Sequence, residues 1–166
     1  FTASLRNSLI VAGLGALLAL LIGIPAAWAV SRMPRRFSWV LHTSVATYML
    51  PPVALVVPMY FALSGFGALN NVFSLAIVYL SILAPFTAWL LKSNFDNVPF
   101  EIEQAAMMDG ANLMQIMRNI TLPLAAPGLT TAGLFAFLLA WDEFFYALLF
   151  TADQRAKTLA VAIADL

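Results

Sequence analysis

The chain has 166 residues, of which 63% are apolar and only 10% are charged, and its mean hydropathy is +0.92. Soluble domains carry about 25% charged residues, so this composition excludes a soluble globular surface and indicates a polytopic membrane protein. The net charge of zero argues against a nucleic-acid partner. Because the chain has no cysteine and a single histidine, His42, we expect no metal site in it.

Charged residues are absent from three long stretches, 7–31, 37–91 and 119–141. A membrane-spanning helix needs about 20 apolar residues, so the first and third stretches each accommodate one span. The second accommodates two, separated by the turn-forming sequence SGFGALNN at 64–71. The predicted fold is an all-α helical membrane bundle. It forms one transmembrane domain over 1–166, with spans at about 9–30, 39–63, 71–91 and 124–150.

The basic residues between the spans predict the orientation, because short cytoplasmic loops carry an excess of Lys and Arg. With four spans, the loop after the first span and the loop at 92–123 lie on the same side. Five basic residues fall on that side and three on the other, so the loop that includes residues 101–127 is predicted to be cytoplasmic. The five are Arg32, Arg35, Arg36, Lys92 and Arg118, and the three are Arg6, Arg155 and Lys157.

Small residues recur at helical spacing in the first and last spans. They are Ala12, Ala16, Ala19, Gly23 and Ala26 in the first span, and Ala132, Ala136 and Ala140 in the last. Helices in lipid associate where small side chains let their backbones approach, so we interpret both stripes as helix-packing faces.

Prolines interrupt the two middle spans. Pro51 and Pro52 are adjacent, Pro58 follows them, and Pro85 lies in the third span. Proline removes a helical hydrogen bond, and transporters use broken helices at their substrate sites. For Pro85 we expect a plain kink. For Pro51 and Pro52 a kink and a broken helix lining a substrate path remain equally open.

The last span carries two acidic residues beside aromatic ones, in the order Trp141, Asp142, Glu143, Phe144. A charge inside a spanning helix suggests a functional cavity, and aromatic rings beside carboxylates suit a sugar. The alternative is an interfacial aromatic belt near the end of the helix. Adjacent helical residues point about 100° apart, so this pair does not form the opposed carboxylates of a hydrolase.

The segment 101–127 is the longest polar-bearing part of the chain. Pro99 suits a first helical turn, Asp109 and Gly110 signal a turn, and Asn112 is placed to cap a second helix. We expect Pro123 and Pro127 to end that helix and to begin the last span. The prediction is two short helices at about 99–120, joined at a glycine elbow. The second helix has an apolar face of Leu113, Ile116, Met117 and Ile120.

This segment resembles the cytoplasmic signature of the permeases of binding-protein-dependent ABC importers, which has the form E-A-A-x3-G-x9-I-x-L-P. The matching residues are Ala105, Ala106, Gly110, Ile120, Leu122 and Pro123. The flanking Asp109 and Ala111, with MLPPVALVVPMY, APFTAWLL and Trp141 to Phe144, are similar to the carbohydrate, maltose-type branch. Gln104 stands where the signature has glutamate, so the charged contact is expected to be missing or to move to Glu103. Trp-Asp at 141–142 replaces the usual Trp-Asn.

The resemblance implies the core of a six-span subunit whose initial and final spans are absent from this sequence. It implies a multi-pass protein of a bacterial or archaeal plasma membrane, surrounded by lipid. The partners would be a second related permease, an extracytoplasmic solute-binding protein and two ATP-binding subunits. ATP and Mg²⁺ would reside in those subunits, because this chain has no G-x-x-x-x-G-K-[ST] sequence with which to cradle ATP. No cofactor is expected in this chain.

The site residues follow from the same resemblance. ATPase coupling would involve Glu103, Gln104, Ala105, Ala106, Asp109, Gly110, Ala111, Ile120, Leu122 and Pro123, and the substrate path would involve Pro51, Pro52, Trp141, Asp142, Glu143 and Phe144. The expected function is sugar import by alternating access, without catalysis in this chain. Two alternatives remain: an ABC importer for a non-sugar solute, or an ion-coupled secondary transporter that uses Asp142 and Glu143 as a proton relay.

Overall fold

A computed structural model describes residues 1–151 and 156–165, apart from the side chains of Leu41 and Pro52. Arg155, which entered the count of basic residues, lies outside the described residues. Every regular element of the described chain is helical, which confirms the all-α prediction. Three of its helices are long and apolar enough to cross a membrane, or four if one bent pair forms a single span.

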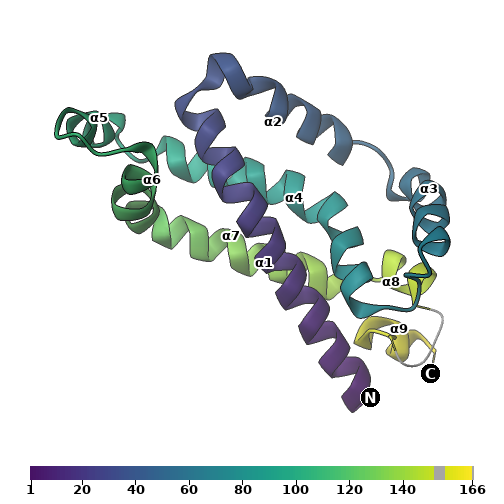
Figure 1. The fold of residues 1–166 in the computed structure, drawn as a ribbon. Helices are drawn as coiled ribbons and strands as arrows, with labels where there is room; N and C mark the ends of the chain where they lie inside the picture. Colours follow the sequence, from purple (N-terminus) through teal and green to yellow (C-terminus); the bar gives the residue numbers. More distant parts are fainter. Residues whose placement is uncertain (152–155, 166) are drawn as a thin grey trace.

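Three long helices form the body of the molecule: α1 (Thr2–Arg32), α4 (Val72–Asp96) and α7 (Leu122–Asp142). In Figure 1, α1 crosses α4 and α7. The contact between them is made by small side chains, because Ala12 and Ala19 of α1 and Ala136 of α7 are fully buried in one cluster with Ala76 of α4. The predicted packing role of the small-residue stripes is therefore confirmed.

The second predicted span, 39–63, is not one straight helix. It is divided between α2 (Pro34–Tyr48) and α3 (Pro52–Gly65), and the axes of residues 34–48 and 53–65 differ by 98°. Pro51 sits at the break in an extended conformation, with ψ of 133°. Proline lacks an N–H and restricts the residue before it, so two in succession favour a break over a kink. Pro58 and Pro85 lie inside helices that continue through them.

The cytoplasmic segment of the prediction forms a hairpin of two helices, α5 (Phe100–Met108) and α6 (Leu113–Ile116). The expectation that Pro123 and Pro127 end the second helix is wrong. The chain stays helical from Leu113 to Asp142, through the π-helical turn η1 (Met117–Thr121) and into α7. In η1 the Leu122 N–H bonds to the carbonyl of Met117, five residues back. This wider turn precedes Pro123, whose missing N–H then falls in the first turn of α7.

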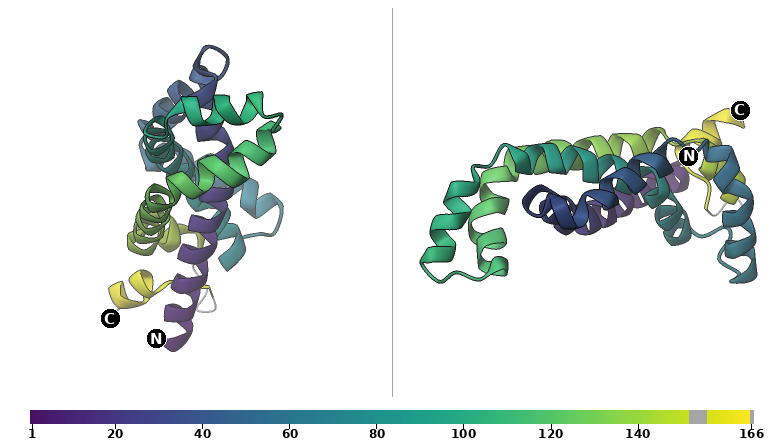
Figure 2. Two further views of the ribbon diagram at one scale, coloured as in Figure 1. Left: turned by 90° about the vertical axis from the view of Figure 1, so that its left-hand side faces the viewer. Right: turned by 90° about the horizontal axis from the view of Figure 1, so that it is seen from above.

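The predicted span 124–150 is also divided. Helix α7 ends at Asp142, Glu143 is extended with ψ of 117°, and a short helix α8 (Phe145–Phe150) follows. A last helix, α9 (Leu159–Ala164), packs against α1. Figure 2 shows that α5 and α6 turn away from the direction of α4 and α7 at one end of the molecule, whereas both termini lie at the other end.

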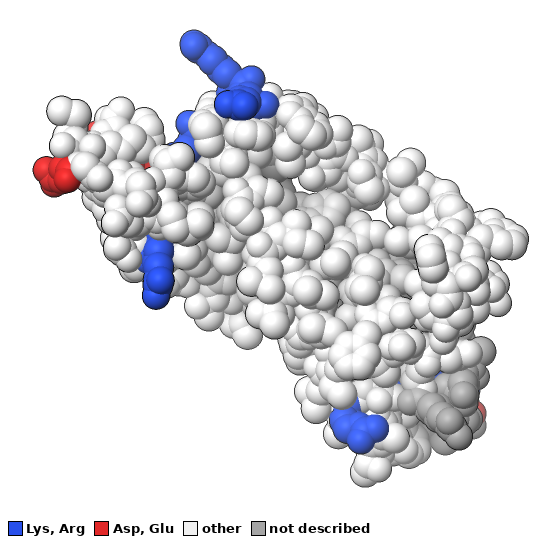
Figure 3. Space-filling view, viewed as in Figure 1, with Lys and Arg blue, Asp and Glu red and all other residues white. Residues whose placement is uncertain are grey.

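The space-filling view in Figure 3 shows where the charges gather on one face. Basic side chains lie near the α1–α2 junction, near the hairpin and near the start of α1, and the long surface between these regions carries no charge. An uncharged band between charged ends is the arrangement that a lipid bilayer requires of a spanning protein.

Candidate functional site

The turn between α5 and α6 is built from local chemistry. Gly110 has φ of +87°, a region that residues with a Cβ rarely adopt, so glycine lets the chain reverse there. Asn112 and Gln115 then form a reciprocal capping box. The Asn112 side chain accepts from the Gln115 N–H at 2.9 Å, and the Gln115 side chain accepts from the Asn112 N–H at 2.9 Å. The predicted glycine elbow and Asn112 cap are both confirmed.

The outer surface of the hairpin carries apolar side chains, among them flexible methionines. Met108 is 88% exposed and Met114 is 65% exposed. On the predicted apolar face of the second helix, Leu113 is exposed whereas Ile116 is fully buried. Methionine adapts its shape to a binding partner, so two exposed methionines beside the elbow suit a docking surface. A hollow of about 340 Å³ lies on the same side, lined by Asn112, Met114, Gln115, Arg118 and Asn119.

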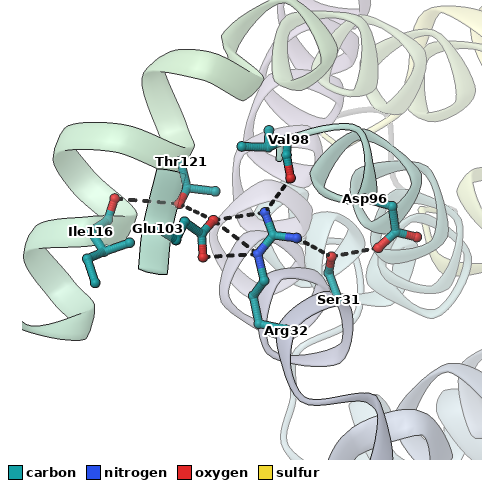
Figure 4. A network of polar contacts seen from close by, with 7 residues as sticks. All are labelled: Ser31, Arg32, Asp96, Val98, Glu103, Ile116 and Thr121. Atoms are coloured by element: carbon teal, nitrogen blue, oxygen red, sulfur yellow. Dashed lines mark hydrogen bonds and ion pairs between the residues drawn. The ribbon is translucent and has the colours of Figure 1, made fainter. Parts of the chain in front are cut away.

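At the base of the hairpin, Glu103 forms a buried ion pair with Arg32 from the end of α1. The Glu103 side chain is fully buried and that of Arg32 is 9% exposed. Arg32 donates from Nε to both carboxylate oxygens at 3.0 Å and from Nη2 to Oε1 at 2.8 Å. The Thr121 hydroxyl, from η1, donates to Oε1 at 2.7 Å. Figure 4 shows this network, in which one carboxylate joins three separate segments.

The network continues to the end of α4. Arg32 donates from Nη2 to the Val98 carbonyl at 3.1 Å and from Nη1 to the Ser31 hydroxyl at 3.2 Å. Ser31 in turn donates to Asp96 at 2.6 Å. The Arg32 guanidinium also lies 5.6 Å from the centre of the Phe100 ring. The arginine therefore holds the ends of α1 and α4 and the start of α5 in one arrangement.

Of the two alternatives expected for the charged contact, missing or moved to Glu103, this geometry argues against the second. Its side chain has no exposed surface and both oxygens are bonded within the chain, so it presents no carboxylate outward. Sequence reasoning missed Arg32 and Thr121 as members of the site. The available signal was that Arg32 follows a charge-free span, yet nothing in the order of residues pairs positions 71 apart.

The other predicted coupling residues are distributed around the hairpin. The exposed ones are Gln104, Ala105, Asp109, Gly110 and Pro123, and the partly buried ones are Ala106, Ala111, Ile120 and Leu122. Four of the exposed residues, Gln104, Ala105, Asp109 and Gly110, lie on α5 and the elbow, whereas the exposed Pro123 lies with Ile120 and Leu122 in η1 and the first turn of α7. The structure thus places one group on the hairpin and the other group where the hairpin joins α7.

The predicted substrate-path residues of the last span have unlike surroundings. Trp141 stacks on Phe137 with ring centres 5.9 Å apart, and Asp142 and Phe144 are exposed. Glu143 caps α8, because its carboxylate accepts from the Tyr146 N–H at 3.0 and 3.1 Å and from the Ala147 N–H at 3.3 Å. A carboxylate committed to three backbone bonds is poorly suited to a proton relay.

The predicted substrate-path residues of the second span lie at the α2–α3 break. Pro51 is exposed there, and Pro52 begins α3, although its side chain lies outside the described residues. A cavity of about 240 Å³ connects this break with α8, since Tyr48, Leu50 and Tyr146 all line it. The structure therefore brings the neighbourhood of Pro51 close to the neighbourhood of Glu143.

Residues 9–164 match the family described as "Binding-protein-dependent transport system inner membrane component". Among similar proteins, the inner membrane ABC transporter permease protein YcjP of Escherichia coli is 36% identical over 95% of this chain and 57% of its own length. The trehalose/maltose transport system permease protein MalG of Thermococcus litoralis is 37% identical over 99% of this chain and 59% of its length. The sulfoquinovosyl glycerol transport system permease protein SmoH of Agrobacterium fabrum is 36% identical over 96% of this chain and 56% of its length.

Proposed function

Because this chain belongs to the family of binding-protein-dependent transport system inner membrane components, we propose that it is a transmembrane subunit of an ATP-driven sugar importer. The chain spans between 56% and 59% of the length of the three relatives described above, so the activity of the whole importer is part of this proposal. The family is a permease component, which makes the chain a transport subunit rather than a catalyst.

The observation that carries the proposal is the mechanical connection of the hairpin to the spans. The α5–α6 hairpin projects from the body, and the buried Arg32–Glu103 pair and Thr121 bind its base to α1 and η1. A hairpin attached through one buried ion pair moves with the helices that it contacts, because separating the pair leaves a charge without a partner. Motion of a partner docked on the hairpin would therefore reach α1, α4 and α7 together.

We infer two roles for the coupling residues. Gln104, Ala105, Ala106, Asp109, Gly110 and Ala111 form the surface that docks an ATPase, as a helix in a groove. Glu103, Ile120, Leu122 and Pro123 hold the hairpin to the body. With Gln104 in place of glutamate and Glu103 buried, the exposed Met107 and Met108 supply apolar docking surface near the elbow.

The remaining partners complete the proposed importer. Two ATP-binding subunits hold ATP and Mg²⁺ on the cytoplasmic side, a second related permease forms the other half of the path, and an extracytoplasmic binding protein delivers the solute. The hairpin side is cytoplasmic on the count of basic residues, of which Arg32, Lys92 and Arg118 lie at that end. Relatives named for trehalose/maltose and sulfoquinovosyl glycerol support a sugar-like solute over another class.

An ion-coupled secondary transporter is the competing function, with Asp142 and Glu143 as its relay. The capping role of Glu143 favours the importer. The energy source separates the two: uptake that survives loss of the proton gradient but stops on ATP depletion supports the importer, and the reverse result supports the relay.

Docking is tested by Met108→Cys, since this exposed side chain lies next to the elbow and the chain has no other cysteine. In the assembled complex we expect it to crosslink to an ATP-binding subunit. Phe66→Cys is the matched control, because Phe66 is 87% exposed in the loop at the other end. Modification of Met108→Cys from outside intact cells would reverse the orientation and remove the basis of the proposal.

Coupling is tested by Gly110→Trp against Gly67→Trp. Both glycines have positive φ, +87° and +63°, and a Cβ at either would have no atom within 4 Å, so both variants place a bulky residue at positive φ without a clash at Cβ. Only Gly110 lies on the proposed docking surface. We expect Gly110→Trp to abolish uptake and solute-stimulated ATP hydrolysis while Gly67→Trp retains both, and equal loss in the two variants would contradict the coupling role.

A further inference from the structure

The corner between α1 and α2 carries two arginines whose charge is not neutralised within the described chain. Arg35 and Arg36 are both exposed, and the ion pairs that the structure describes involve other basic residues. Arg32, three positions before Arg35, is already bonded to Glu103. Figure 3 shows basic side chains projecting from this corner, at the border of the uncharged band. Two guanidinium groups without a carboxylate partner suit an anionic group, above all a phosphate.

A stripe of exposed side chains leads from Arg35 along α2. Trp39, His42, Ala46 and Met49 follow it at steps of three and four residues, so the five lie on one face of the helix. In Figure 1, α2 runs along the outer edge of the molecule, and its other side packs against α1 and α4. Trp39 is 62% exposed and Met49 is 79% exposed. Because tryptophan is enriched at the membrane–water interface, its place one turn after Arg35 suits a headgroup region.

The far end of this stripe borders an open hollow of about 350 Å³ between α2 and α4, and none of the residues that line it is charged. Val45 lies ten residues after Arg35, which is about 15 Å along a helix, and half of the hydrocarbon core of a bilayer is also about 15 Å thick. The hollow therefore lies at the depth that lipid acyl chains occupy. Its lining residues are Val45, Tyr48, Met49, Pro85, Phe86 and Trp89.

We propose that this face of α2 binds an anionic phospholipid of the cytoplasmic leaflet, with the phosphate at Arg35 and Arg36 and an acyl chain in the hollow between α2 and α4. A soluble anion would leave the apolar hollow empty, and an uncharged lipid would leave the arginines without a counter-charge. The leaflet follows from the ion pair of Arg32 with Glu103, which places this corner at the hairpin end of the molecule. Anionic lipids of the cytoplasmic leaflet attract basic residues next to a spanning segment.

Arg35→Gln tests the charged end of this site in the purified, assembled complex. Phosphatidylglycerol is titrated into the complex in a neutral detergent, and native mass spectrometry measures the affinity for the first lipid bound. Loss of Arg35 should weaken binding about fivefold and loss of both arginines about 25-fold, and phosphatidylcholine should bind more weakly than phosphatidylglycerol. Arg6→Gln, which removes one exposed charge at the other end of α1, should leave the affinity unchanged. Unchanged affinity in the double variant, or equal affinity for the two lipids, would overturn the inference.

Val45→Trp tests the apolar end, because it fills the hollow and keeps both arginines. The affinity for phosphatidylglycerol should fall several-fold, whereas Val57→Trp on α3, which is 58% exposed and outside the hollow, should leave it unchanged. An unchanged affinity in Val45→Trp would contradict the acyl-chain site.

Two other occupants of this face would also overturn the inference. Displacement of the lipid by excess inorganic phosphate would identify a soluble anion as the ligand. Release of the second permease or of the ATP-binding subunits from the Arg35→Gln complex would identify the face as a protein interface. The inference goes beyond the proposed transport function, and no solute is present in these measurements, so its failure would leave the importer proposal standing.

Discussion

Glu103 and Glu143 are two acidic side chains set among apolar helices, and their carboxylates find hydrogen-bond partners in different ways. Glu103 is paired with the side chain of Arg32, which is 71 positions away in the sequence, and Glu143 is paired with the backbone N–H groups of Tyr146 and Ala147, three and four positions away. An ion pair between helices connects segments that are distant in the sequence. A cap orders the start of its own helix, and the one bond from Glu143 to a distant helix uses its carbonyl, which accepts from the Tyr79 hydroxyl of α4 at 3.2 Å.

The difference shows what a carboxylate can do inside an apolar protein. A charge there is retained only with partners, and the choice of partner determines how far its influence reaches. At the hairpin base, one carboxylate joins α1, α5 and η1, so a change at the hairpin is felt across the body. At the α7–α8 break, the carboxylate starts a short helix and positions Tyr146 beside the cavity.

The largest effect is expected from Glu103→Ala, which leaves the Arg32 guanidinium buried without its partner. Breaking a buried pair in this way costs about 3–5 kcal/mol of unfolding free energy, and uptake should be lost. The measurement is denaturant unfolding of the purified subunit followed by circular dichroism. In the double variant Arg32→Met, Glu103→Leu, stability should return while coupling does not. If Glu103→Ala lowered the unfolding free energy by less than about 1 kcal/mol, the Glu103 ion pair would not stabilise the protein more than the Glu143 cap does.

Gly128→Ala should have the next largest effect, because it tests the close approach of α4 and α7 next to the hairpin. A Cβ at Gly128 would lie 1.9 Å from Oδ1 and 2.8 Å from Cβ of Asn94, so the helices must separate. We expect a loss of about 1–3 kcal/mol in the same unfolding measurement, as for overpacking. Gly13→Ala, at a site with no atom within 4 Å of the added Cβ, is the control and should not destabilise the protein.

Glu143→Ala should cost about 1 kcal/mol, the usual loss for a helix cap. The effect should be local, so crosslinking at Met108→Cys should be unchanged. Glu143→Gln, which keeps an acceptor oxygen, should recover most of the lost stability. If Glu143→Ala instead abolished crosslinking at Met108→Cys, the effect of Glu143 would extend to the hairpin and would not be local.

Asp142→Asn should have the smallest effect on stability, within about 0.5 kcal/mol, because this side chain is exposed and accepts no hydrogen bond that the structure describes. As a member of the proposed substrate path it should alter the KM for the solute and leave docking of the ATP-binding subunits intact. Loss of docking in this variant would show that the residue belongs to the coupling machinery.

Several features were predictable because they depend on residues close together in the sequence. The membrane class follows from composition, the reversal at Gly110 from its lack of a Cβ, and the capping box from Asn112 and Gln115, three positions apart. The packing stripes of α1 and α7 follow from the helical repeat of small residues. In each case the physical cause lies within one or two helical turns.

Other features were decided only by tertiary structure. The continuation of the helix through Pro123 depends on the π-helical turn before it, and the ion pair of Arg32 with Glu103 depends on where α1 ends relative to α5. Ser81 and Tyr146 line one cavity because α4 and α8 contact each other. The amino-acid sequence determined which side chains needed partners in an apolar protein. Which partners they found depended on the packing of helices distant in the sequence, since hydrogen bonds and ion pairs form between neighbours in space.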